Sequence, residues 1–145
     1  MSYSVDVNIL LYASDRSSEQ YDAANRFLTH CAAGPEILCL AWPILLSYMR
    51  IATHPRIFDS PLAPDEATGN VAALLALPSV RTVAEQDGFL DVYRHVTANL
   101  VVRGNLVPDA QLAAILFQHG VRTLYTRDRD FRKFDFFDVR DPFSP

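Results

Sequence analysis

Short apolar segments alternate along the chain with longer segments in which apolar residues recur every three or four positions. The short segments are rich in β-branched, aliphatic and aromatic residues, which is typical of buried strands. They predict four strands and a possible fifth, at Ser2–Val5, Ile37–Ala41, Val80–Val83, around Leu124, and at Phe136–Val139. Strands that alternate with helices in this way favour βαβ units around a parallel sheet.

The longer segments predict helices, several of which have recognisable ends. Ser17 or Ser18 is a suitable N-cap for the second helix, and Pro43 suits the first turn of the third. The predicted helices cover Asn8–Ala13, a segment through Tyr21 to Cys31, Ile44–Ala52, Asp65–Leu77, Phe89 to near Gly104, and Asp109–His119. We therefore predict one three-layer α/β/α domain over residues 1–145, with a central, mainly parallel sheet of four or five strands.

The composition is that of a globular domain. The chain has 145 residues, of which 50% are hydrophobic and 21% charged. Its longest apolar run, Ile37 to Leu46, has about ten residues and contains Pro43, so it is too short to span a bilayer. No signal segment is recognisable in the first residues, so we expect a cytoplasmic protein without a membrane partner. In that compartment Cys31 and Cys39 are expected to be buried thiols, not a disulfide.

The formal net charge of −4 argues against a surface that coats nucleic acid without discrimination. Of the 13 basic residues, however, only Lys133 is a lysine, and arginine can bind phosphate through two hydrogen bonds. Six basic residues crowd the last quarter of the chain: Arg122, Arg127, Arg129, Arg132, Lys133 and Arg140. The acidic total therefore conceals a local basic rim.

Carboxylates follow or precede apolar elements at three separate places. Asp6 and Asn8 follow the first strand, and Asp109 opens an apolar helix. The fourth strand leads directly into Thr126, Asp128 and Asp130. Because functional groups in open α/β sheets gather at the carboxyl ends of strands, we interpret these positions as one site.

Each aspartate also has an ordinary structural interpretation as a helix or turn cap. Asp6 could cap the turn near Val7, Asp109 could be the N-cap of its helix, and Asp128 or Asp130 could cap a short turn. Gathered in one place, however, two carboxylates about 4 Å apart repel by roughly 4 kcal/mol at an effective dielectric constant near 20. Such a cluster needs protons or a cation, and oxygen ligands suit Mg²⁺ or Mn²⁺, ions that activate water for attack on a phosphodiester.

Four segments of the chain, in their order and spacing, resemble PIN-domain proteins and specifically the VapC toxins of bacterial toxin–antitoxin pairs. The first begins at Asp6-Val7-Asn8 and runs to Ala13. The others are Met49–Thr53 with Pro55, Asn105–Ala110 continuing to His119-Gly120, and Thr126–Phe131. The resemblance covers nearly the whole chain and implies a PIN-like domain.

The resemblance implies an endoribonuclease that depends on Mg²⁺, with Mn²⁺ as a possible substitute. It also implies inhibition by a cognate VapB-type antitoxin and assembly as a homodimer. Carried over by position, Asp6 and Asp109 would be the principal metal ligands, Asp128 would complete the acidic site, and Asp130 would assist. Asn8 and Thr126 would hydrogen-bond to the ligands. The RNA backbone would be bound by Arg50, Arg127, Arg129 and Arg132.

One position departs from the family pattern. Many PIN domains carry a glutamate three residues before the position of Arg50, where this chain has Ser47. The Ser47 hydroxyl could still orient water but brings no charge, so we expect weaker metal binding than in a complete four-acid site. Two alternatives stay open. The first is a catalytically impaired PIN module that acts by binding antitoxin or RNA without cleavage. The second is a nuclease that acts on DNA.

Overall fold

The computed structural model describes residues 1–144, so residue 145 of the predicted 1–145 domain lies outside the described residues. Five strands form one sheet in the order β3-β2-β1-β4-β5, and every neighbouring pair is parallel. The strands are β1 Ser2–Val5, β2 Ile37–Ala41, β3 Val80–Val83, β4 Thr123–Tyr125 and β5 Asp138–Arg140. The predicted parallel sheet is confirmed.

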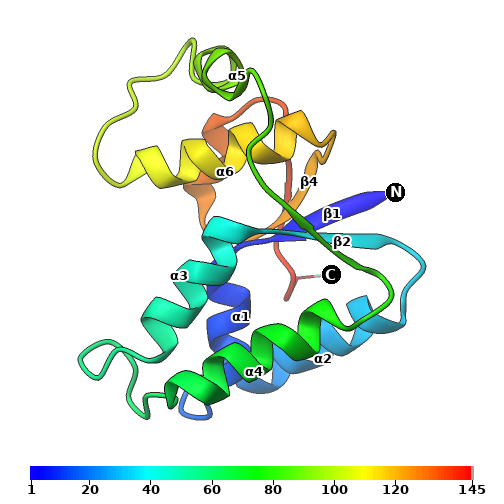
Figure 1. Ribbon diagram of the computed structural model, residues 1–145, viewed down its shortest axis with the longest axis vertical. Coiled ribbons are helices and arrows are strands. Elements are labelled where there is room, and N and C mark those ends of the chain that lie inside the picture. The colour runs from blue at the N-terminus through cyan, green and yellow to red at the C-terminus, as the bar shows by residue number, and fades with distance from the viewer. Residues whose placement is uncertain (145) are drawn as a thin grey trace.

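Helices cover both faces of the sheet. They are α1 Val7–Ser14, α2 Tyr21–Ala33, α3 Trp42–Ala52, α4 Pro64–Leu75, α5 Phe89–Val96 and α6 Leu106–Gln118, with a 3₁₀ helix η1 at Arg129–Lys133. Figure 1 shows α5 and α6 on one side of the sheet and α1, α2 and α4 on the other. The three-layer α/β/α architecture is therefore confirmed.

The core lies where the central strands meet α1, α3 and α6. Val5, Leu40 and Leu124 from β1, β2 and β4 are completely buried. In α6 the run from Leu112 to Leu116 is buried throughout, since this helix packs between the sheet and α5. Burial on this scale fixes the strand ends, and hence the polar residues that directly follow them.

Several predicted boundaries are wrong, each for a local reason. The second helix begins at Tyr21, because the Ser18 hydroxyl accepts a hydrogen bond from the Gln20 N–H and holds a turn before it. The helix starting at Phe89 ends at Val96, well short of Gly104. The fifth strand is displaced to Asp138–Arg140.

Side-chain burial agrees with most of the sequence interpretation. Cys31 and Cys39 are buried free thiols, as predicted. Trp42 is 38% exposed at the start of α3. Among the described residues no helix combines the length and apolar character needed to cross a membrane.

Candidate functional site

The site begins at the carboxyl ends of two neighbouring parallel strands. Val5 of β1 pairs with Tyr125 of β4, so the residues that follow them, Asp6 and Thr126, emerge side by side. The Asp6 N–H continues the ladder by donating to the Tyr125 carbonyl at 3.0 Å. Asp6 is only 5% exposed and Thr126 only 3% exposed, which makes them two of the few buried polar residues in the described part of the chain.

Hydrogen bonds hold Asp6 and Thr126 in fixed orientations. The Thr126 hydroxyl donates to Asp6 Oδ2 at 2.9 Å, and the Val7 N–H donates to Asp6 Oδ1 at 2.7 Å. Asp6 is therefore the N-cap of α1, as one sequence interpretation proposed. Capping does not exclude a second role, because a carboxylate oxygen can accept more than one bond.

The same network continues into the segment after β4. The Asp128 N–H donates to the Thr126 hydroxyl at 3.0 Å, and Asp128 Oδ1 accepts from the Asp130 N–H at 2.9 Å. Asp128 is thus the N-cap of η1. One hydroxyl, that of Thr126, links the two acidic segments that are farthest apart in the sequence.

Asp109 reaches this edge of the sheet from α6. It was a candidate N-cap, but the helix begins at Leu106 and Asn105 occupies the cap position. The helix starts earlier because Pro108 is tolerated in a first turn, where its missing N–H is not needed. Asp109 therefore lies inside the first turn and makes no capping bond, so its carboxylate is available for other contacts.

The negative charges of the other aspartates act on Asp109. Burial, followed by the negative charges of Asp128, Asp6 and Asp130, raises the pKa of Asp109 from 3.8 to about 6, with Lys133 acting in the opposite direction. Burial also raises the pKa of Asp6, opposed by its hydrogen bonds from Thr126 and Val7. Mutual repulsion of this kind is typical of functional acidic sites. Hydrogen bonds thus link Asp6 to Asp128 through Thr126, and Asp128 to the Asp130 N–H, while the negative charges of these three aspartates act on Asp109.

The donor set suits a hard divalent cation, although it is incomplete. Within residues 1–144 no three His, Cys, Asp or Glu side chains lie close enough together to hold an ion by themselves. Mg²⁺ commonly binds through one or two carboxylates and retains several waters, so the carboxylates of Asp6 and Asp109 are compatible with it. The assignment of Asp6, Asp109 and Asp128 as ligands stays a prediction.

The raised pKa of Asp109 predicts a pH-dependent stability difference. A carboxyl group that titrates at a higher pH in the folded state favours folding below pH 4, and this benefit is lost as the pH rises through 6. At pH 7.5 the free energy of unfolding of Asp109→Asn should therefore exceed that of the wild type by about 1–2 kcal/mol after allowance for solvent screening, and its unfolding temperature should be higher. Near pH 4 the two proteins should differ little. Thermal unfolding without divalent ions measures this difference.

The exposed Asp91 on α5 supplies a control for the loss of one charge. Asp91→Asn should show no such pH-dependent gain. Equal gains for Asp91→Asn and Asp109→Asn would contradict local repulsion as the cause.

The other predicted site residues are less closely engaged. In the described part of the chain neither Ser47, half-buried on α3, nor the exposed Asn8 makes a hydrogen bond to the acidic side chains. Arg50 is exposed near the end of α3. The structure therefore shows no contact that supports the proposed roles of Ser47, Asn8 and Arg50.

The predicted basic rim is partly neutralised. Arg127 pairs with Asp141 at 3.7 Å and lies over the Phe143 ring at 5.6 Å. Lys133 pairs with Asp130 at 3.6 Å, whereas Arg129 and Arg132 are exposed and form no ion pair within residues 1–144. The C-terminal partners of Arg127 could not be inferred from spacing, because they depend on how the chain folds back after β5.

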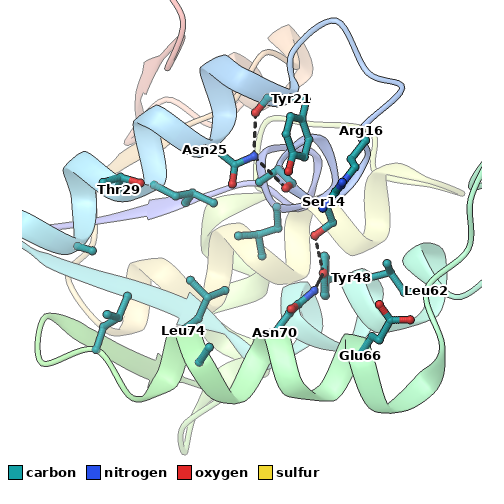
Figure 2. Close-up of a pocket in the computed structure, with 16 residues that line it drawn as sticks. Ser14, Arg16, Tyr21, Asn25, Thr29, Tyr48, Leu62, Glu66, Asn70 and Leu74 are labelled. Carbon is teal, nitrogen blue, oxygen red and sulfur yellow. Dashed lines mark hydrogen bonds between the residues drawn. The ribbon is translucent and has the colours of Figure 1, made fainter.

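A groove of about 570 Å³ lies on the helical layer away from α6, bounded by α1, α2, α3 and α4. Figure 2 shows a hydrogen-bonded chain on its wall, in which Asn70 Nδ2 donates to the Tyr48 hydroxyl and that hydroxyl bonds to Ser14 Oγ. Leu28, Leu74 and other apolar residues form the rest of the wall.

Comparison with known proteins agrees with the architecture. Residues 3–137 match the family model described as PIN domain. The chain therefore belongs to the PIN-domain family.

The relatives narrow this assignment. The chain is 44% identical to Ribonuclease VapC48 of Mycobacterium tuberculosis over 99% of both chains, and 34% identical to Ribonuclease VapC37 of the same species over 90% of both. Its fold matches VapBC2 from Rickettsia felis, bound to a promoter DNA fragment, with a TM-score of 0.70, 15% identity and coverage of 97% and 98%. It also matches Mycobacterium tuberculosis VapC20, described as a sarcin-ricin loop cleaving toxin, with a TM-score of 0.68, 17% identity and coverage of 95% and 98%. The predicted resemblance to VapC proteins is confirmed.

Proposed function

We propose that this protein is the toxin of a VapBC-type pair and that it is a metal-dependent endoribonuclease. The observation that supports this proposal is the acidic site, in which Thr126 links Asp6 to Asp128, and burial followed by the charges of Asp128, Asp6 and Asp130 raises the pKa of Asp109. The full-length relatives named ribonucleases support the choice of RNA as substrate.

In this proposal Asp6 and Asp109 would hold the cation, with Asp128 and Asp130 beside them. Bound Mg²⁺, or Mn²⁺ in its place, would supply the positive charge and the activated water needed for attack on a phosphodiester. Thr126 fixes Asp6 by donating to one of its oxygens, and the N-cap bond from Val7 fixes the other. The exposed guanidinium groups of Arg129 and Arg132 would bind the RNA backbone.

The direct test is incubation of the purified protein with total cellular RNA in Mg²⁺, Mn²⁺ or excess EDTA, followed by mapping of new 5′ ends. Discrete cuts that need a divalent ion support the proposal. Unchanged cutting in EDTA would refute the metal requirement, and equal cutting of matched single-stranded DNA would refute RNA selectivity.

A second candidate is an impaired PIN module that binds antitoxin or RNA without cutting. Ser47 in place of a carboxylate, and the incomplete ligand set in residues 1–144, favour it. Binding without cleavage at every Mg²⁺ and Mn²⁺ concentration, together with cleavage gained on Ser47→Glu, would select this candidate.

We further propose that a VapB-type antitoxin inserts an amphipathic segment into the groove of Figure 2. The groove offers an apolar wall for the segment and a polar chain of Ser14, Tyr48 and Asn70 for its hydrogen bonds. Such a mixture suits a helix with one apolar face. The neighbouring structures described as VapBC complexes support an antitoxin as the partner.

Two adjacent alanines of α4 provide a matched test of this partner surface. Both Ala72 and Ala73 are exposed, but only Ala73 lines the groove. Ala73→Arg should weaken antitoxin binding about ten- to a hundredfold by obstructing the groove, whereas Ala72→Arg should not. Titration calorimetry with the co-expressed antitoxin measures this. Equal affinities for the two variants would place the partner elsewhere.

A homodimer is also part of the proposal. Trp42 and Leu46 lie one turn apart on α3 and are both exposed, so they present an apolar surface that a second copy could cover. Sedimentation of the purified protein determines whether the pair assembles.

A further inference from the structure

A second cavity, of about 330 Å³, lies near the far end of α6 from Asp109. Phe117 lines it from the last turn of that helix, about 12 Å from Asp109 along the helix axis at 1.5 Å per residue. The other residues used here come from α5, the segment after it and the segment around η1: His95, Asn99, Lys133, Asp135 and Phe136. Figure 1 shows α5 lying across α6 at this end of the molecule.

Three rings form a continuous aromatic surface at this cavity. The centroids of His95 and Phe117 are 5.3 Å apart, and those of Phe117 and Phe136 are 5.1 Å apart with their planes perpendicular. Phe117 is 38% exposed, although the five residues that precede it in α6 are buried. An exposed ring held between two others is a ready surface for stacking.

The core holds this surface in place. Phe136 stacks on Phe137 with centroids 4.2 Å apart, and Phe137 in turn contacts the buried rings of Phe131 and Phe134. Because these rings are already ordered, a flat ligand that stacks on them would not have to immobilise free side chains.

Charge connects the cavity to the acidic site. Lys133 lines the cavity, and its ammonium lies 3.6 Å from Asp130 Oδ1. An exposed pair of this kind contributes little energy, so the ammonium can turn towards a phosphate instead. The cavity also contains Asp135, which disfavours a phosphate inside it, whereas Asp135 and Asn99 together offer acceptors and donors to the edge of an uncharged base.

We propose that this aromatic subsite, formed by His95, Phe117, Phe136 and Lys133, binds one unpaired nucleobase of the RNA substrate beside the cleaved linkage. The base would stack face to face on Phe117 and contact Phe136 with its edge, and Lys133 would contact the phosphate that leads towards the acidic site. A base paired within a duplex cannot enter, so the subsite selects single-stranded RNA. The inference rests on the proposed ribonuclease function, but it can be tested without cleavage.

The test uses a short single-stranded oligoribonucleotide that carries the fluorescent base 2-aminopurine, with protein in the Asp109→Asn background so that the strand stays intact. Stacking in the subsite should quench the fluorescence. Phe117→Ala should weaken binding about tenfold or more and remove the quenching. Phe117→Leu keeps apolar volume but no ring, so it should fold as the parent does and still lose the quenching.

Leu90, 60% exposed on α5 and outside the cavity, provides the control. Leu90→Ala should leave both affinity and quenching unchanged. Lys133→Gln should weaken binding and lower the slope of log affinity against log salt by about one. A fully paired duplex carrying the same label should show no quenching.

The result separates this inference from the proposed function. Quenching that depends on Phe117 supports the subsite even if the wild-type protein cuts no RNA. RNA cleavage by the wild type, with quenching unaffected by Phe117→Ala and Phe117→Leu, would overturn the subsite and leave the nuclease proposal standing. Loss of antitoxin binding in these variants with RNA affinity unchanged would likewise overturn it, by assigning the surface to a protein partner.

Discussion

Asp109→Asn is expected to lower RNA cleavage at pH 7.5 by about 10²–10⁴-fold, because a carboxylate that holds a divalent cation contributes several kcal/mol of charge stabilisation in the transition state. Asparagine keeps the size of the side chain but removes the negative charge. The measurement is the single-turnover rate of cleavage of a mapped RNA site at saturating Mg²⁺.

With this substitution, an effect on catalysis can be distinguished from an effect on folding. The pKa of Asp109 is raised to about 6 by burial and the neighbouring carboxylates, so the neutral variant should be at least as stable as the wild type at the assay pH. Loss of cleavage with an unchanged or higher unfolding temperature would then be a loss of function alone. The exposed Asp91→Asn is the matched control and should retain full activity. A wild-type rate for Asp109→Asn would remove Asp109 from the proposed mechanism.

The sheet was predictable because the burial of a strand is reflected in the apolar residues of its sequence. β1, β2 and β3 were predicted with the bounds that the structure has, since each is a short segment rich in β-branched, aliphatic or aromatic residues. Helix ends were less predictable, because they depend on local hydrogen bonds. Serine is a common N-cap residue, but the Ser18 hydroxyl accepts a hydrogen bond from the Gln20 N–H in the turn before α2.

The acidic site was partly predictable for a related reason. Once β1 and β4 were assigned to one parallel sheet, Asp6 and Thr126 had to emerge at the same edge if the two strands were neighbours. Neither the spacing nor the composition could show that Thr126 donates to Asp6 or that Arg127 pairs with Asp141. The exposure of Phe117 could not be predicted from the sequence either, because its position continues the apolar pattern of a buried helix.

Thr126→Val is expected to destabilise the protein by about 1–3 kcal/mol, because the change removes the hydroxyl that donates to the buried Asp6 carboxylate and accepts from the half-buried Asp128 N–H. That hydroxyl donates to Asp6 Oδ2 and accepts from the Asp128 N–H, and valine of nearly the same shape can do neither. For a chain of this size the unfolding temperature should fall by roughly 3–8 °C. Thr126→Ser keeps the hydroxyl and is the matched control, with a much smaller expected change.

A second measurement distinguishes a positioning role for Thr126 from a purely structural one. Its hydrogen bond lowers the pKa of Asp6 against the larger opposing effect of burial, so its removal should raise that pKa further. The Asp6 carboxylate would then form only at higher pH, and the acidic limb of the pH profile for RNA cleavage should move to higher pH in Thr126→Val but not in Thr126→Ser. If Thr126→Val unfolds at a lower temperature but keeps the wild-type pH profile, the hydroxyl stabilises the fold without tuning the acidic site.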